Sequence, residues 1–274
     1  MIHSGMTEIT NEELKRISLD ILLDVKDYCE RHCLQYYLVC GTALGAIRHN
    51  GFIPWDDDID IGMPRPDYEK FLAGYRSETC YLLDPRSGRN YPYAFAKVCD
   101  KRTVLVEKIE NPFPMGVYID VFPIDGIPSD PKKQKQHLTK IDWDLRFISW
   151  KRISREKKLD RVHKLIQTVA KTVLAPVPFS VLIDRLDRDL KSVPYETSEF
   201  VGHLATKAYW GSDCKPKAIF EPPVKHAFED REFCVPGDYD GYLTLEYGDY
   251  RKLPPVEKQV SHHDFVAYWA ETQA

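Results

Sequence analysis

The segment GFIPWDDDIDIGM, residues 51–63, places four aspartates within five positions: Asp56, Asp57, Asp58 and Asp60. Its other members are mostly large and apolar, and a carboxylate is costly to bury without a partner. From Asp58 onward, charged and apolar residues alternate with the period of a β-strand that has one buried face. The spacing therefore predicts that Asp58 and Asp60 project from the same face of a strand.

A third carboxylate is expected beside this pair. The stretch GVYIDVFPIDG, residues 116–126, predicts a second apolar strand, and it carries Asp120. Neighbouring carboxylates repel one another unless a cation lies between them. Mg²⁺ prefers oxygen ligands and keeps room for waters and substrate phosphates, and Mn²⁺ is the alternative metal. The sequence thus predicts a metal site at Asp58, Asp60 and Asp120, whereas a solvated acidic turn is the blander interpretation.

A second element of the site is predicted directly upstream. The run YYLVC, residues 36–40, is short, apolar and typical of a buried strand, and it leads through Gly41 and Thr42 into a helix that extends to Asn50. Backbone N–H groups and the helix dipole make such a helix start an anion-binding corner. Together the two elements predict a phosphate at the helix start and a metal between that phosphate and the acids.

Composition and charge limit the classes of partner. The chain of 274 residues has 38 Lys and Arg against 42 Asp and Glu, a formal net charge of -4. It lacks the global basic field that holds nucleic acid. No secretory signal pattern or membrane-length apolar run is found, so a cytoplasmic location is expected. Seven scattered cysteines then indicate reduced thiols rather than a disulfide framework.

The remaining pattern indicates an α+β fold, with a small mixed β-sheet flanked by helices and a helical middle region. A capping box at Thr10 and Glu13 predicts a long first helix that extends to about Cys33. Residues 131–190 have helical spacing with a break near residues 175–178. We expect residues 1–128 to form the catalytic core, and residues 129–274 to complete the cleft within one compact unit.

Four stretches resemble the LicD family of phosphocholine transferases, which includes the fukutin-type glycan phosphotransferases. They are YYLVCGTALGAIRHNGFIPWDDDIDIGMPRPDYEKF (36–71), AFAKVCDKRT (94–103), GVYIDVFPIDG (116–126) and YLTLEYGDYRKLPP (242–255), the last followed by His262 and His263. The resemblance covers most of the chain, and the basic helical middle is its least diagnostic part. It implies a nucleotidyltransferase core like that of the β-type DNA polymerases.

The resemblance also implies an enzyme, a phosphotransferase that takes phosphocholine from CDP-choline or a related CDP-alcohol and releases CMP. The acceptor would be a hydroxyl of a cell-surface glycan or its lipid-linked precursor, in teichoic acid, lipopolysaccharide or capsule. Asp58, Asp60 and Asp120 would be both metal ligands and catalytic residues. Asp120 is the candidate for taking the proton of the acceptor hydroxyl.

The expected substrate-binding residues surround these acids. Gly41 and Thr42 would cradle the donor phosphates, with Arg48 and Lys97 as cationic phosphate ligands. Trp55 would stack on the base or the choline ammonium. The full expected set is Gly41, Thr42, Arg48, His49, Trp55, Asp57, Lys97, His262 and His263.

Several of these assignments have structural alternatives. Arg48 is equally compatible with a surface salt bridge, and Trp55 with a core position. Asp56 and Asp57 would either surround the metal ligands or hydrogen-bond Arg48 and His49. His262 and His263 would close over the site or lie on the surface.

The basic middle helices also have two interpretations. Functionally, they would bring the enzyme to an anionic membrane surface, with LAPVPF (174–179) entering the interface. Alternatively, they are solvated helix faces that pair with Glu156, Asp160 and Asp184. The basic residues concerned are Lys132, Lys133, Lys135, Arg146, Lys151 and Arg152.

Three functions follow from these patterns. The first is the Mg²⁺-dependent phosphotransferase, and the second is a nucleotidyltransferase that moves NMP from an NTP. The third is a binding protein with a solvated acidic loop. The released product, CMP or pyrophosphate, separates the first two.

Overall fold

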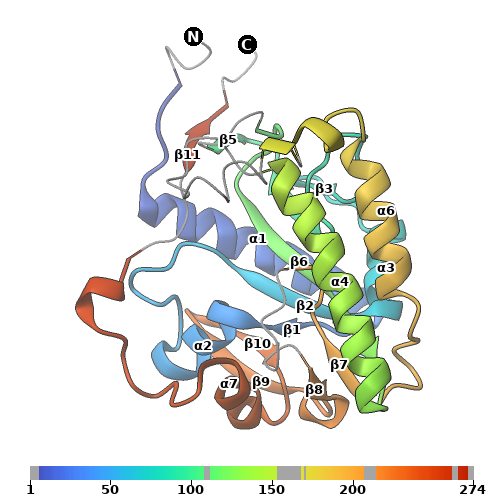
Figure 1. Ribbon diagram of the computed structural model, residues 1–274. Helices are drawn as coiled ribbons and strands as arrows, with labels where there is room; N and C mark the ends of the chain where they lie inside the picture. The colour runs from blue at the N-terminus through green and yellow to red at the C-terminus, as the bar shows by residue number, and fades with distance from the viewer. Residues whose placement is uncertain are drawn as a thin grey trace.

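A computed structural model describes residues 6–107, 112–152, 168–169, 171–206, 214–260 and 265–270. It confirms the α+β class, with a mixed sheet of seven strands and helices packed around it (Figure 1). Two small two-stranded sheets accompany this central sheet in the described part of the chain.

Five strands form the main path of the central sheet in the order β1-β2-β6-β4-β3. The neighbours β2 and β6 are parallel, and the other pairs on this path are antiparallel. The strands are β1 (Tyr37–Leu38), β2 (Asp60–Pro64), β3 (Cys80–Leu83), β4 (Ala96–Asp100) and β6 (Tyr118–Ile127).

Strand β6 is the organising strand, and it is almost wholly buried. Its first half pairs with β4 and its second half with β7, which in turn pairs with β8. Elsewhere β9 and β10 form a hairpin, and β11 pairs with β5. These strands are β5 (Thr103–Glu107), β7 (Phe200–Gly202), β8 (Lys215–Pro216), β9 (Val224–Phe228), β10 (Arg231–Val235) and β11 (Phe265–Trp269).

The first helix begins where the sequence predicts. Thr10 caps it through the Glu13 N–H, and the Glu13 carboxylate accepts from the Thr10 N–H at 2.9 Å, so the capping box is confirmed. The helices are α1 (Asn11–His32), α2 (Cys40–His49), α3 (Arg65–Gly74), α4 (Pro131–Arg152), α6 (Phe179–Leu190) and α7 (Tyr239–Tyr247), with short 3₁₀ turns η1 (Lys217–Ile219) and η2 (Val256–Lys258).

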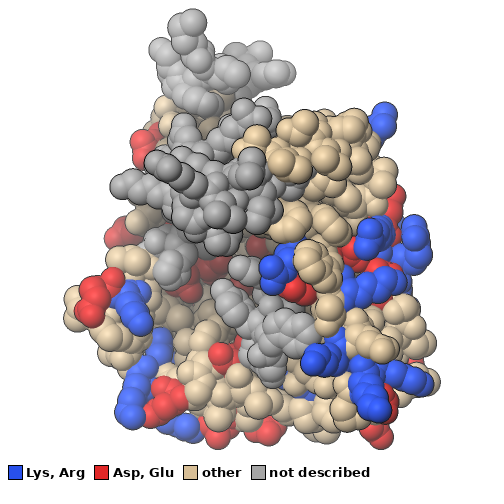
Figure 2. All heavy atoms as spheres, viewed as in Figure 1, with Lys and Arg blue, Asp and Glu red and all other residues tan. Residues whose placement is uncertain are grey.

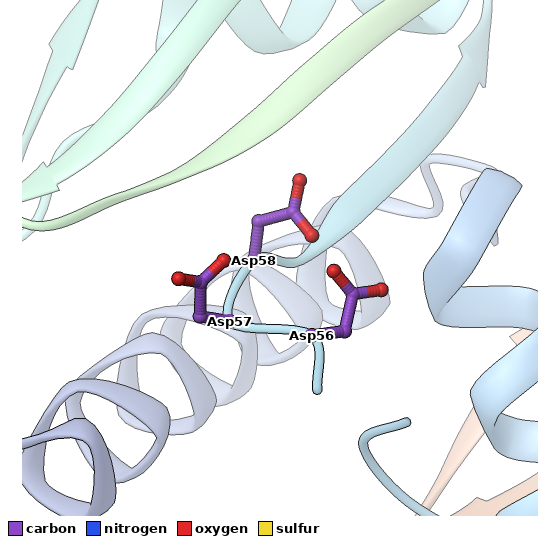
Figure 3. A group of neighbouring side chains, drawn as sticks. All are labelled: Asp56, Asp57 and Asp58. Atoms are coloured by element: carbon purple, nitrogen blue, oxygen red, sulfur yellow. The ribbon is translucent and has the colours of Figure 1, made fainter. Parts of the chain in front are cut away.

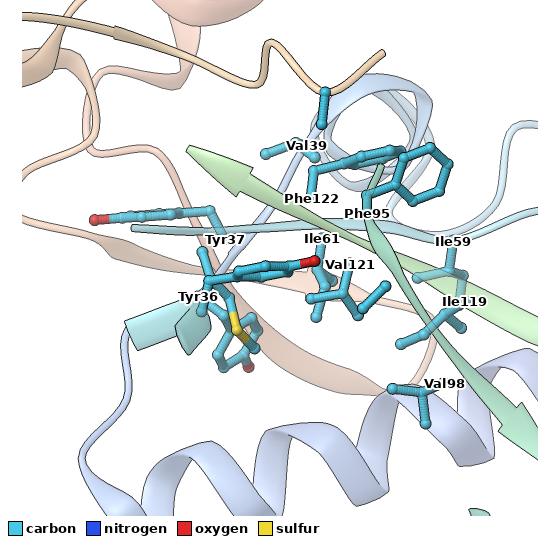
Figure 4. Packing of buried hydrophobic residues seen from close by; sticks show 14 of the residues in the cluster. Tyr36, Tyr37, Val39, Ile59, Ile61, Phe95, Val98, Ile119, Val121 and Phe122 are labelled. Carbon is cyan, nitrogen blue, oxygen red and sulfur yellow. The ribbon is translucent and has the colours of Figure 1, made fainter. Parts of the chain in front are cut away.

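The two faces of the sheet differ in what covers them. Helix α1 covers one face, where Ile61, Val98, Ile119 and Val121 pack between the strands and the helix (Figure 4). Because successive side chains on a strand point to opposite faces, Asp60 and Asp120 lie on the other face. The fold therefore separates an apolar face, which stabilises it, from a face that carries the carboxylates.

The predicted boundaries around the acidic segment need two corrections. Strand β2 begins at Asp60, so Asp58 lies in the preceding loop and not on the strand. Cys40, predicted to end a strand, is instead the first residue of α2, after a β1 of only two residues. Long-range contacts set the geometry at these positions, because the Cys40 N–H donates to the Tyr242 hydroxyl and the Asp60 N–H donates to the Thr42 hydroxyl.

The described part of the basic middle includes α4, helical residues 171–174 and α6, and the predicted break at residues 175–178 directly precedes α6. The predicted partners Glu156 and Asp160 lie outside the described residues. No helix in the described ranges is both long and apolar enough to cross a membrane. All seven cysteines are free thiols, as expected.

A buried ion pair joins α3 to β6. The Arg65 guanidinium makes a two-pronged contact with Asp125, with Nε–Oδ1 at 2.6 Å and Nη2–Oδ2 at 2.7 Å. The Asp125 side chain is 1% exposed and that of Arg65 is 10% exposed. Removing one partner of such a pair leaves an uncompensated buried charge.

We predict that Arg65→Met lowers the free energy of unfolding by about 3–5 kcal/mol, because Asp125 would stay buried without its cation. Arg251→Met is the matched control, since Arg251 pairs with Asp240 at a site where both side chains are more than half exposed. Urea denaturation of the three proteins measures the difference. Equal loss in both variants would contradict a special role for the buried pair.

Candidate active site

The register of two parallel strands brings two of the predicted acids together. Asp60 on β2 is directly opposite Asp120 on β6. The Asp120 N–H also donates to the Ile59 carbonyl at 2.9 Å, which extends the pairing to the residue before β2. Residues separated by 60 positions thus form one carboxylate pair at the start of both strands.

Thr42 fixes the start of β2. Its hydroxyl oxygen accepts a hydrogen bond from the Asp60 backbone N–H at 2.8 Å, and the residue is buried. The predicted phosphate contact from this hydroxyl stays a prediction. What the structure adds is a direct link from the first turn of α2 to the backbone that carries Asp60.

The loop before β2 holds a second acidic group. One carboxylate oxygen from each of Asp56, Asp57 and Asp58 lies within 4.8 Å of the others, and all three residues are partly buried. Figure 3 shows the three side chains rising from one side of this loop. Asp58 therefore belongs to a tight cluster in the loop and also lies two residues before the Asp60–Asp120 pair.

Glycine at position 41 allows this loop to approach α2. A Cβ atom added at Gly41 would lie 2.8 Å from the Asp56 Oδ2 atom. The Asp56 carboxylate is thus held against the N-terminal turn of α2, where the helix dipole favours negative charge. The helix start that the sequence assigned to donor phosphates already has a protein carboxylate beside it.

Electrostatics at Asp60 indicate that the site favours a cation. Burial raises the pKa of Asp60 well above its usual value, and the charges of Asp58, Asp120 and Asp56 raise it further, with Lys97 opposing them. A divalent cation would relieve this repulsion, and the donor set consists of oxygen atoms only, as Mg²⁺ and Mn²⁺ prefer. The residues present therefore fit the expected metal.

Lys97 points inward, onto the carboxylate face. It is opposite Asp120 in the β4–β6 register, is 1% exposed, and its Nζ lies 2.5 Å from Asp120 Oδ1. Three aromatic rings surround the ammonium, with centroids 3.5 Å away for Tyr118, 4.5 Å for Tyr93 and 5.3 Å for Phe95. The Lys97 ammonium therefore offsets part of the Asp120 charge and holds this carboxylate in one position.

One wall of the site connects to the end of α4. The Tyr93 hydroxyl donates to Glu107 Oε1 at 2.6 Å and accepts from the Arg152 guanidinium at 2.9 Å. That guanidinium also lies 4.3 Å above the Tyr93 ring. Arg152, the last residue of α4, therefore contacts Tyr93, whose ring lies beside Lys97, the partner of Asp120.

Arg48 has a different environment from either predicted one. Its Nη1 donates to the Tyr250 carbonyl at 2.8 Å and, more weakly, to the Lys252 carbonyl at 3.4 Å, while its Nε donates to His49 Nε2 at 3.0 Å. Burial and the Arg48 charge lower the pKa of His49. Arg48 therefore ties the segment after α7 to α2, and a direct phosphate contact stays a prediction.

Trp55 lies at the edge of the same loop. It is partly buried against the core, and its ring meets that of His49 edge to face with centroids 6.3 Å apart. The contact with the core agrees with the packing alternative, and stacking of Trp55 on a base or on choline stays a prediction. His262 and His263 lie outside the described residues.

The structure adds a buried polar cluster that sequence reasoning missed. The Cys40 N–H, at the first residue of α2, donates to the Tyr242 hydroxyl at 3.1 Å, and Cys40 Sγ lies 3.6 Å from His203 Nε2. Beside them, Lys215 Nζ lies 2.6 Å from the Glu246 carboxylate, with the lysine fully buried.

The neighbours of Glu246 favour its charged form. Burial acts to raise the pKa of Glu246, but His203 and Lys215 outweigh it and lower the net value. Glu246 and Tyr242 lie in the YLTLEYGDY stretch that drew attention by resemblance. His203 directly follows β7 and Lys215 begins the two-residue β8, and no local pattern marks either residue.

We predict that Thr42→Val lowers the free energy of unfolding by about 1–3 kcal/mol, because it leaves the Asp60 N–H without its acceptor. Thr42→Ser keeps the hydroxyl and should lose clearly less. Thermal and urea denaturation compare the two variants. If valine and serine are equivalent, the Thr42–Asp60 link does not hold the strand start.

The raised pKa of Asp60 gives a pH-dependent prediction for the protein in EDTA. The folded state binds this proton more tightly than the unfolded chain does, so the contribution of Asp60 to stability falls as pH rises above about 4. Asp60→Asn removes that titration and should be more stable than wild type at pH 8. The difference should vanish near pH 3.

Denaturation midpoints across this pH range measure the effect, with the exposed Asp184→Asn on α6 as the control. An Asp60→Asn protein less stable than wild type at pH 8 would contradict the repulsion inferred for this site.

Comparison with known proteins agrees with the resemblance seen in the motifs. A family profile described as LicD/FKTN/FKRP, nucleotidyltransferase domain, matches residues 33–180. The lipopolysaccharide cholinephosphotransferase LicD of Haemophilus influenzae is 35% identical over 272 residues, covering 96% of this chain and 99% of that protein. An uncharacterized protein of Rickettsia typhi is 41% identical over 56 residues, 20% of this chain and 18% of that protein. The chain therefore belongs to the LicD family.

Proposed function

We propose that this protein transfers phosphocholine from CDP-choline to a hydroxyl group of lipopolysaccharide or its lipid-linked precursor, with release of CMP. Similarity along nearly the whole of both chains to a lipopolysaccharide cholinephosphotransferase carries the proposal. The carboxylate pair Asp60–Asp120, with Asp58 adjacent, supplies the chemistry that such a transfer requires. We place the reaction on the cytoplasmic side of the membrane, on a nucleotidyltransferase-type core.

In the proposed reaction, an acceptor hydroxyl oxygen attacks the phosphorus that carries choline. The bond from that phosphorus to the oxygen bridging toward CMP breaks, and CMP leaves with the electron pair. Asp120 takes the acceptor proton, and Lys97, 2.5 Å away, keeps its carboxylate in position. Mg²⁺ held by Asp58, Asp60 and Asp120 would neutralise charge on the diphosphate and on the departing CMP.

The other residues would bind and orient the donor. The N-terminal turn of α2 at Gly41 and Thr42 would offer backbone N–H groups to the diphosphate, next to the Asp56 carboxylate that also lies there. Trp55, beside His49, offers a ring face to the base or to the trimethylammonium group. Arg48 would act indirectly, because it holds the segment after α7 against α2. Asp57 would orient the metal ligands from its place in the loop cluster.

We predict that the purified protein releases CMP from CDP-choline only with Mg²⁺ or Mn²⁺. Asp58→Asn, Asp60→Asn and Asp120→Asn should each lower the rate by about 10²-fold or more, because preorganised charge stabilisation is lost. Asp184→Asn is the control, since it removes an exposed carboxylate from α6. CMP release and transfer to lipopolysaccharide are followed by chromatography and mass spectrometry.

Two results would count against this function. Pyrophosphate release from a nucleoside triphosphate, without CMP release from CDP-choline, would instead identify a nucleotidyltransferase. Unchanged activity in all three aspartate variants would show that the carboxylates do not carry the reaction.

A further inference from the structure

Helix α4 presents two different surfaces along its length. Its buried face carries Leu138, Ile141 and Ile148. Its outer side follows positions 132, 135, 139, 143, 146 and 150, which are three or four residues apart and so share one stripe of an α-helix. The N-terminal half of this stripe is basic, and the C-terminal half is aromatic.

The aromatic end is a partly exposed apolar surface, in which Phe147 and Trp150 are half-buried. The rings of Trp143, Phe147 and Trp150 contact one another, with centroids 5.7–6.5 Å apart. Trp143 is 48% exposed, and Val181 at the start of α6 is 53% exposed. Exposed clusters of large apolar side chains are uncommon on soluble proteins and mark interaction sites. We call Trp143, Phe147, Trp150 and Val181 the aromatic patch.

Contacts between α4 and α6 make these residues one surface. Arg185, one turn beyond Val181, lies 5.7 Å from the Phe147 ring and pairs with Asp144 at 2.8 Å. Lys151 lies 5.2 Å from the Phe179 ring. The patch is therefore built on two packed helices and is bordered by cations.

The charge on α4 indicates what would bind there. Residues 131–152 contain seven Lys or Arg and two Asp, a formal charge of +5. Both aspartates are already paired, Asp142 with Arg146 and Asp144 with Arg185. Two of the cations pair with acids outside the helix, Lys140 with Asp189 and Arg152 with Glu107. Figure 2 shows basic side chains toward the lower, N-terminal end of α4 and an uncharged area over its upper end. An anionic partner with an apolar interior complements both halves.

We propose that the outer stripe of α4 and the aromatic patch dock the protein onto an anionic lipid bilayer. Indole and phenyl rings are favoured at the level of the lipid headgroups, and lysines add attraction to anionic headgroups. A second copy of this helix would bring like charge to the basic half, which favours a lipid surface over self-association.

Docking through this surface would place the active site near the membrane. Arg152 ends α4 and contacts Tyr93, whose ring lies 4.5 Å from Lys97, the partner of Asp120. The C-terminal end of α4, two residues beyond Trp150 of the aromatic patch, is thus joined to the wall of the site through Arg152. An acceptor anchored in the bilayer would meet the carboxylates from this side.

The test is co-sedimentation with vesicles of phosphatidylcholine alone and of phosphatidylcholine mixed with phosphatidylglycerol. Wild type should pellet with the mixed vesicles and much less with the neutral ones. Val181→Glu should weaken binding about tenfold or more, because it adds an anion where an apolar side chain enters the interface. Lys132→Gln/Lys135→Gln should weaken binding and reduce its dependence on salt.

Val256→Glu is the matched control, because Val256 is 78% exposed in η2, outside α4 and α6. Equal binding of Val181→Glu and Val256→Glu, or equal binding to both vesicle types, would overturn the proposal. So would a dimer that Val181→Glu dissociates, with no vesicle binding by wild type. CMP release from soluble CDP-choline is measured in parallel, so that failure of docking and failure of the proposed function are distinguished.

Discussion

The parallel pairing of β2 with β6 places Asp60 directly beside Asp120, and the rest of the site depends on that register. A shift of one residue would turn one of these carboxylates into the apolar layer against α1. The packing of Ile61, Ile119 and Val121 against that helix therefore fixes the chemistry on the opposite face. Fold stability and site geometry are two consequences of one alternating pattern.

The negative charge of adjacent carboxylates must be offset by positive charge, and the side chains of the protein supply only part of that positive charge. Lys97 contributes one positive charge to Asp120, and aromatic rings enclose its ammonium on the protein side. Asp60 still has a raised pKa, because burial and the neighbouring Asp58 and Asp120 charges outweigh that cation. The remaining repulsion is the physical argument for a divalent cation among these oxygens, and it is independent of family resemblance.

Local patterns predicted much of this arrangement. Alternation identified β2 and β6 and with them the strand positions of Asp60 and Asp120, and the capping box located α1. Alternation could not show that Asp58 leaves the strand, because a loop residue and a strand residue can share one spacing. Nor could it show that the Thr42 hydroxyl is used on the Asp60 backbone. Such contacts depend on how the loop folds back against α2.

Sequence analysis missed the buried polar cluster for a different reason. Cys40 contacts His203 and Tyr242, and both lie more than 160 positions away in the sequence. Lys215, which pairs with Glu246, lies in an element too short to show a period. Arg48 likewise finds its acceptors at the Tyr250 and Lys252 carbonyls, about 200 residues away. Only the assembled chain brings them together, so no window of sequence could reveal them.

These long-range contacts also show what the second half of the chain does for the first. The hydroxyl of Tyr242, on α7, receives the first N–H of α2, and Arg48 near the end of α2 binds the segment that follows α7. Helix α2 is thus held at both ends by residues beyond position 200. Since Thr42 in its first turn positions Asp60, the C-terminal part of the chain acts on the carboxylate pair through this helix. Residues far along the chain thus help to align the carboxylate pair.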